Sequence, residues 1–151
     1  MMLEIDPQAK QGVQLGPVTV TAEDIQSFAE AMGDLNPLYT DVETARAAGY
    51  PDVIAPPMFC MRMRGGKLLP EVPLPSGFMS LHAGQEIEFH DEIIAGQTYT
   101  ITSRVADVYE KTGRSGPMEI IVRESTITDT EERTIVTIRE RQIVRSPEKK
   151  I

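Results

Sequence analysis

From residue 78 onward, the hydrophobic pattern takes a period of two, and this constrains the fold more than any other feature. Four runs carry strand character: QEIEFH, YTITSRVADVY, MEIIVRESTI and RTIVTIRERQIV. Alternating and β-branched residues are typical of strands with one buried face, and the glycines that separate these runs are typical of hairpins. The C-terminal half is therefore predicted to form an antiparallel meander of about four strands.

The N-terminal half carries a helical period instead. In TAEDIQSFAEAMG the apolar residues fall on one stripe, Thr21 and Asp24 have the spacing of a capping box, and Gly33 ends the run. A second, shorter helix, VETARAA, is predicted to begin at Asp41 and to stop at Gly49. These two helices flank a loop that is rich in turn-forming residues.

A third helix is predicted to begin at about Pro57, because a proline in the first helical turn removes only an N–H that has no intrahelical partner. Its side chains are bulky and flexible: Met58, Phe59, Met61 and Met63. It ends near Gly65, and the proline-rich loop that follows is a candidate lid. An antiparallel sheet must cover one apolar face, so we predict an α+β fold in which the sheet wraps around a long central helix.

Composition excludes several classes of function. The chain has 151 residues and no apolar run of about 20, and its N-terminus MMLEIDPQAK lacks a signal peptide's apolar stretch, so we expect a single domain (residues 1–151), cytoplasmic and without a membrane anchor. A net charge of −8 argues against nucleic-acid binding. One cysteine and two histidines, His82 and His90, predict neither a disulfide nor a metal site, and no cofactor is expected.

The loop GDLNPLYTD, residues 33–41, holds the candidate reactive residues. Asp34 follows the helix-ending glycine, so its carboxylate either accepts backbone N–H groups in an Asx turn or works on a substrate. Asn36, which precedes a proline, either stabilises the turn or contacts a ligand, and Tyr39 either covers the edge of the core or faces that ligand.

The run FAEAMGDLNPLYTDVETARAAGYPDVIAPPMF resembles the hydratase signature of the MaoC-like hot-dog proteins. In that family a helix ends in a Gly-Asp-x-Asn-Pro-x-His loop, and an Ile-Ala-His-Gly stretch opens the central helix. The later LHAGQEIEFHDEIIAGQTY is similar to the sheet region of the subgroup called the MaoC dehydratase N-terminal, or fatty-acid-synthase-type-I-like, domain. The resemblance covers about residues 17 to 145 and implies the hot-dog fold.

The resemblance also implies a chemistry. In active family members the Asp and His act on the water that is added to, or removed from, a trans-2-enoyl thioester, and N–H groups at the start of the central helix hold the thioester oxygen. Asp34 matches, but Tyr39 replaces the His, and a phenol with a usual pKa of about 10 is a poor base at neutral pH. Pro57 replaces the glycine and offers no N–H. Asp34 is thus left in an incomplete dyad with Tyr39.

The resemblance therefore implies a subunit of a hetero-oligomeric enoyl-thioester hydratase or 3-hydroxyacyl-thioester dehydratase of fatty-acid metabolism. This chain would bind the acyl-CoA or carrier-protein thioester, while a second hot-dog chain supplies an intact Asp/His dyad. One alternative is a self-sufficient homodimeric hydratase or thioesterase that uses Asp34 with Tyr39 or His82. Another is a non-enzymatic acyl-CoA-binding module.

The residues predicted to bind substrate share two locations, the loop and the central helix. They are Asn36, Tyr39, Pro57, Met58, Phe59, Met61, Arg62 and Arg64. Along the helix, the Met and Phe side chains either belong to the core or line an acyl tunnel. The basic group Arg62, Arg64 and Lys67 either forms a solvated face or holds the phosphates of the thioester's carrier.

Overall fold

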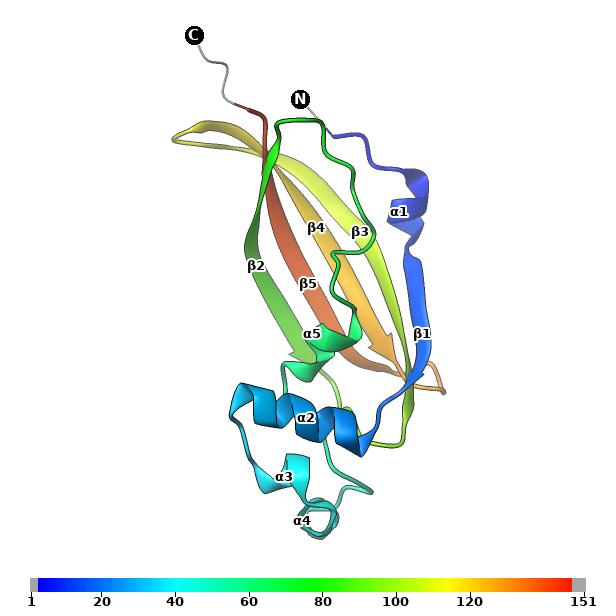
Figure 1. Ribbon diagram of the computed structural model, residues 1–151. Coiled ribbons are helices and arrows are strands. Elements are labelled where there is room, and N and C mark those ends of the chain that lie inside the picture. The colour runs from blue at the N-terminus through cyan, green and yellow to red at the C-terminus, as the bar shows by residue number, and fades with distance from the viewer. Residues whose placement is uncertain (1–2, 148–151) are drawn as a thin grey trace.

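The two-residue period of the C-terminal half produces a five-stranded antiparallel sheet, with the helices gathered on one side of it (Figure 1). The computed structural model describes residues 3–147. The strands are β1 (Val13–Thr19), β2 (Met79–Phe89), β3 (Thr98–Gly113), β4 (Gly116–Thr128) and β5 (Thr134–Arg145). The helices are α1 (Pro7–Gln11), α2 (Ala22–Met32), α3 (Pro37–Thr40), α4 (Val42–Ala47) and α5 (Phe59–Met63). The predicted α+β class is confirmed.

The order of strands across the sheet is β1-β3-β4-β5-β2. The predicted meander therefore holds for β3 to β5 but is wrong for β2, which pairs with β5 at the opposite edge from β1. The segment between β2 and β3 explains this placement. It crosses the end of the sheet, where Ala55 N–H donates to Ile93 O at 2.8 Å and Gly96 N–H donates to Val20 O at 2.7 Å. These bonds carry the chain across to start β3 beside β1.

The first strand was not among the predicted elements. β1 contains Gly16-Pro17, and its register with β3 shifts between Leu15 and Val18. Proline cannot donate to a ladder, and in sheets it is confined largely to edges and bulges. β1 meets this condition because it lies at the edge of the sheet.

Both predicted N-terminal helices are confirmed, with their caps. Thr21 Oγ1 accepts from Asp24 N–H at 3.1 Å at the start of α2, and Gly33 closes that helix in the left-handed conformation at φ 69°. Asp41 caps α4 through Thr44 N–H at 3.3 Å. No helix in residues 3–147 is long and apolar enough to cross a membrane.

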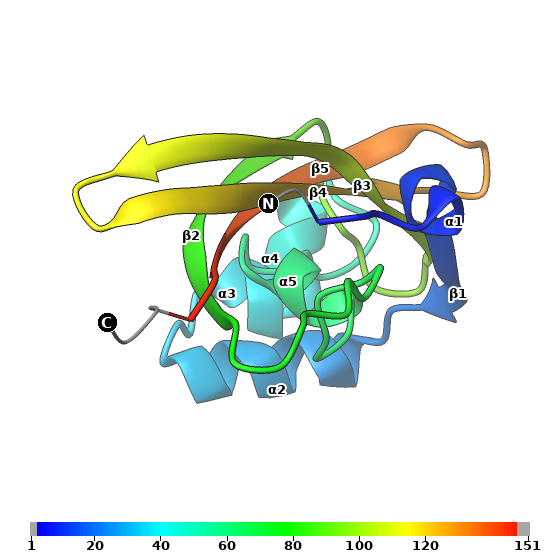
Figure 2. The ribbon, with the colours of Figure 1, turned by 90° about the horizontal axis from the view of Figure 1, so that it is seen from above.

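The central helix is much shorter than predicted. α5 begins at Phe59 and spans only five residues, because the chain leaves the helix at Arg64 and Gly65-Gly66 follows. Figure 2 shows the sheet arching over α5, with α2 at the bottom of the view. The core between sheet and helices contains fully or almost fully buried Ile25, Phe59 and Ile127.

A proline-rich segment, residues 65–77, covers the part of the sheet that a longer helix would otherwise cover. We call this segment the strap. It runs from α5 up the inner face of the sheet toward β2 (Figure 1). Its apolar residues Val72 and Leu74 pack against a second cluster that includes Val105, Ile121 and Val144. The candidate lid of the sequence therefore lies on the sheet.

Candidate active site

The loop after α2 is shaped by backbone and side-chain bonds that fix Asp34. Its N–H donates to Ala29 O at 3.0 Å, which continues the helix closure begun at Gly33. Its carboxylate accepts from Asn36 N–H at 3.4 Å, so the Asx turn expected of such a residue is present. Asp34 is nevertheless exposed, and this weak bond leaves its carboxylate accessible.

Asn36 caps the short helix α3. Its side-chain oxygen accepts from Leu38 N–H at 3.0 Å, and Pro37 occupies the first helical position. This is the turn-stabilising role that the sequence offered as one alternative. Asn36 is also exposed beside Asp34.

Tyr39 lies on α3 with its side chain directed into the core, and only 9% of the residue is exposed. Burial raises the pKa of its phenol, and the negative charges of Asp34 and Glu92 raise that pKa further. Tyr39 therefore keeps its proton at neutral pH and cannot serve as the base that an imidazole would provide. Its hydroxyl remains a hydrogen-bond donor.

Glu92 is a member of this site that the sequence did not reveal. It lies in the segment between β2 and β3. Ile94 of this segment pairs with Ile54, and Ile54 N–H also donates to Leu38 O at 3.0 Å, next to Tyr39. These two links bring the segment of Glu92 toward the loop of Tyr39. Burial raises the pKa of Glu92, with a further contribution from Asp91. A half-buried carboxyl group of this kind is suited to proton transfer.

The start of α5 offers few N–H groups. Pro56 and Pro57 have none, and Phe59 N–H donates to Pro56 O at 3.0 Å in a turn. Met58, the N-cap, has no side-chain cap bond and is 39% exposed. Its N–H is the first that this helix start can offer to a thioester oxygen.

The bulky side chains of α5 divide between core and cavity. Phe59 is 3% exposed and packs edge-on against Phe28 at 5.5 Å between ring centroids. Met61 is half-buried against the same core. Phe59 and Met63 also line a cavity of about 230 Å³ between α5 and β1, whose other walls are mainly Leu15, Val18, Val20, Ile101, Asp24 and Arg62. This cavity joins an apolar interior to a charged rim.

The basic group of α5 is not a single patch. Arg62 is half-exposed, lies 3.5 Å from Asp24 and stacks over Phe59 at 5.7 Å from the ring centroid. Arg64 instead forms a largely buried ion pair with Glu140 at 2.9 Å, with side chains 17% and 6% exposed. Of the two, Arg62 remains at the rim of the cavity. Lys67 lies farther on, in the strap.

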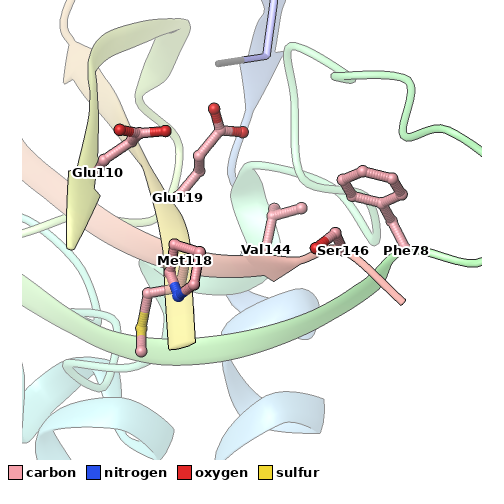
Figure 3. A pocket seen from close by; sticks show the side chains of 7 residues that line it. Phe78, Glu110, Met118, Glu119, Val144 and Ser146 are labelled. Atoms are coloured by element: carbon pink, nitrogen blue, oxygen red, sulfur yellow. The ribbon is translucent and has the colours of Figure 1, made fainter. Parts of the chain in front are cut away.

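His82, an alternative partner of Asp34, lies at the other end of β2 from the loop. His82 and Phe89 are seven positions apart in β2, which corresponds to about 23 Å of strand. Within one chain, His82 and Asp34 are therefore not brought together. A second cavity, of only about 30 Å³, lies at that far end and is lined partly by Glu110, Glu119 and Phe78 (Figure 3). It holds little more than a water molecule.

The raised pKa of Tyr39 makes a direct prediction. Ionisation of this buried phenol is disfavoured in the folded state, so the stability it contributes is complete below pH 10 and is lost as pH rises through the higher folded-state pKa. An ultraviolet absorbance titration of Tyr39→Phe should lack one tyrosine that ionises above pH 10 in the parent chain. Loss of a tyrosine that ionises at or below pH 10 would contradict this site geometry.

Residues 11–138 match the family model of the FAS1-like dehydratase domain region. The chain belongs to this family. The family assignment confirms the MaoC-like hot-dog resemblance drawn from the loop and sheet motifs. Among curated proteins, the chain is 37% identical over 101 residues to UPF0336 protein SCO4636 of Streptomyces coelicolor, a match that spans 64% of this chain and 67% of that protein.

Solved structures of this dehydratase fold superpose on most of the chain. The MaoC-like dehydratase from Rhodospirillum rubrum aligns with a TM-score of 0.69 at 20% identity and covers 99% of both chains. The ChsH1-ChsH2 complex from Mycobacterium tuberculosis aligns with a TM-score of 0.71 at 23% identity and covers 91% of this chain and 85% of that chain. The (3R)-hydroxyacyl-ACP dehydratase complex HadBC from the same organism aligns with a TM-score of 0.67 at 18% identity and covers 92% of this chain and 99% of that chain. These likenesses confirm the hot-dog fold.

Proposed function

We propose that this chain is the acyl-binding subunit of a hetero-oligomeric enoyl-thioester hydratase or 3-hydroxyacyl-thioester dehydratase. A second hot-dog chain supplies the Asp and His that act on the water molecule. The single observation that carries the proposal is the protonated, buried phenol of Tyr39 at the position where the family has a histidine. Its family membership and its likeness to two complexes, ChsH1-ChsH2 and HadBC, support a paired assembly.

Four of the predicted substrate-binding residues take a place in this proposal: Tyr39, Met58, Phe59 and Arg62. The cavity beside α5 takes the acyl chain along Phe59 and Met63, and Met58 N–H and the Tyr39 hydroxyl are donors near the thioester. Arg62, at the cavity rim, contacts a phosphate of coenzyme A or of a carrier protein's prosthetic arm. Arg64 takes no part in this contact because its guanidinium is held by Glu140.

Strand β2 supports the association with a partner. It is an edge strand that pairs with β5 on one side, and it carries large apolar side chains that are well exposed: Met79 at 60%, Leu81 at 58% and Phe89 at 49%. An edge with unpaired backbone groups and apolar side chains is a template for another strand. We propose that the partner's sheet joins here.

Replacing Leu81 with glutamate tests this edge. We expect Leu81→Glu to weaken association with the partner at least about tenfold, because it places a charge in an apolar contact, while the free energy of unfolding of the single chain changes by less than about 0.5 kcal/mol at this exposed site. Sedimentation velocity measures the association. The matched control is Met32→Glu, at an apolar position on α2 that is 59% exposed, as Leu81 nearly is. Equal effects of both variants would contradict joining at β2.

Glu92 favours a second candidate function, a self-sufficient homodimeric hydratase. Burial raises the pKa of its carboxyl group, and its charge, like that of Asp34, raises the pKa of Tyr39, so Glu92 and Asp34 are the acid–base pair of this candidate. In that case Glu92→Gln abolishes turnover by the isolated chain. Under the subunit proposal there is little isolated turnover to lose.

Affinity purification from the native host tests the subunit proposal. We expect the tagged chain to retain, in equal amounts, a second hot-dog chain that carries the Gly-Asp-x-Asn-Pro-x-His loop. Recovery of this chain only as an association with itself would contradict the proposal.

A further inference from the structure

The inner face of the sheet changes character along its length. Where the helices cover it, the face is apolar, but under the strap polar and charged residues lie among apolar ones such as Val105, Ile121 and Val144. All buried polar or charged residues found within residues 3–147 lie on this face of β3, β4 and β5, and they are Ser103, Glu119, Arg123, Ser125 and Glu140. Strand alternation places them beside the core residues Ile121 and Ile127. A position that normally belongs to the core thus carries ionisable groups.

Arg123 is the centre of this polar area. It is 4% exposed, its Nε donates to Pro70 O in the strap at 3.0 Å, and one terminal nitrogen donates to the Gln142 side-chain oxygen at 2.6 Å. Both acceptors are neutral. The carboxylate directly opposite in the register, Glu140, bonds to Arg64 at 2.9 Å instead.

The three ionised groups around Arg123, namely Arg64, Arg123 and Glu140, together carry a net positive charge; Arg64 is 17% exposed and the other two are buried. Burial lowers the pKa of Arg123, Glu140 opposes this change, and the charge of Arg64 adds to it. The other buried carboxylate of this face, Glu119, lies four residues from Arg123 along β4, about 13 Å, and accepts from Leu3 N–H at 2.6 Å. Arg64 Nε is also buried and has no hydrogen-bond partner within the described residues. Buried charges normally require a counter-charge, and no carboxylate of the described residues accepts a hydrogen bond from Arg123.

A cavity of about 310 Å³ opens onto Arg123 from beneath the strap. It is lined by Leu68, Glu71, Val72, Pro73, Arg123 and Gln142. The acidic side chain in this lining, Glu71, is exposed and already lies 3.1 Å from Lys67. The volume is at the small end of the range for sites that hold small molecules.

We propose that this cavity binds a carboxylate, whose oxygens pair with the guanidinium of Arg123 and supply the missing counter-charge. The planar fork of arginine suits a carboxylate through two parallel hydrogen bonds. The carboxylate belongs either to a small free organic acid or to the far end of an acyl group. This site is separate from the loop of Asp34 and Tyr39, and it does not depend on the proposed hydratase function.

Calorimetric titration of the intact chain with glutarate tests the site. We expect glutarate to bind, and glutaramide, which has a similar shape but no charge, to bind at least about tenfold more weakly at matched ionic strength, a difference of about 1.4 kcal/mol. Arg123→Gln should reduce glutarate binding by a similar factor. Arg139→Gln is the matched control, because Arg139 is half-exposed on the opposite face in an ion pair with Glu124. Measurable binding of glutarate that glutaramide equals, or that Arg123→Gln reduces no more than Arg139→Gln does, would overturn the proposal.

Two further measurements complete the test. Arg123→Gln leaves the Arg64 and Glu140 pair balanced, so this variant should fold. If it does not fold, NMR of the parent chain replaces it: the proposal requires glutarate to shift the Nε–H resonance of a buried arginine. Titration with glutaryl-CoA beside hexanoyl-CoA distinguishes the two sources of carboxylate. Binding of free glutarate indicates a small acid, and a preference for glutaryl-CoA without glutarate binding indicates an acyl group. If neither carboxylate probe binds better than its uncharged match, there is no carboxylate site.

Discussion

Replacing Glu140 with alanine should lower the free energy of unfolding by about 3–5 kcal/mol, the range found when one partner of a buried ion pair is removed. Its side chain is 6% exposed and is the partner of Arg64, which is 17% exposed. Without this carboxylate, two guanidinium groups, those of Arg64 and Arg123, remain buried near each other. Urea denaturation followed by circular dichroism measures the change.

An exposed ion pair of similar chemistry is the control for this prediction. Arg46 and Glu43 lie 3.7 Å apart on α4, with side chains that are 57% and 80% exposed. Exposed pairs contribute between about 0 and 1 kcal/mol, so Arg46→Gln should change the free energy of unfolding by no more than this. If Glu140→Ala were as mild as Arg46→Gln, the buried charges would not be a constraint on the fold, and the argument for a missing counter-charge would fail with it.

The strap covers the polar area, because α5 ends at Met63, before Gly65-Gly66. A helix continued through this segment would use its backbone carbonyls internally. The strap instead brings the Pro70 carbonyl within hydrogen-bonding distance of Arg123 at 3.0 Å. A segment without regular secondary structure leaves backbone carbonyls available for such contacts, whereas a helix uses them internally.

Local patterns predicted those elements whose determinants are local. The helix α2 carries its own cap at Thr21 and its own stop at Gly33, and both function as expected. The period of two in β4 also predicts where the polar area lies. In MEIIVRESTI, Arg123 falls on the same face of the strand as Ile121 and Ile127. That signal does not reveal which segment covers it, because the cover comes from the strap, about fifty residues earlier.

The features that escaped prediction depend on contacts between distant segments. β1 is interrupted by Gly16-Pro17, and only its place at the sheet edge makes that acceptable. Glu92 reaches Tyr39 because the segments around Ile54 and Ile94 pair. The position of β2 beside β5 likewise depends on where the chain crosses the sheet, which no local period encodes.

The largest expected effect on activity is the low rate of the isolated chain, which follows from the incomplete site at the loop of Asp34. Loss of an oxyanion donor costs about 10²–10³ in rate, and loss of general acid–base help costs about 10²–10⁴. Because such groups act as a unit, these factors do not simply multiply. Tyr39 is protonated and Pro57 has no N–H, so the isolated chain should be at least about 10²-fold slower than a complete site.

The decisive measurement is the hydration of crotonyl-CoA by this chain alone and by its complex with the dyad-bearing partner, at equal concentrations of active sites. We expect the complex to be at least about 10²-fold faster and to lose its activity when the partner's dyad Asp is changed to Asn. Comparable turnover by the isolated chain, abolished by Asp34→Asn, would contradict the account.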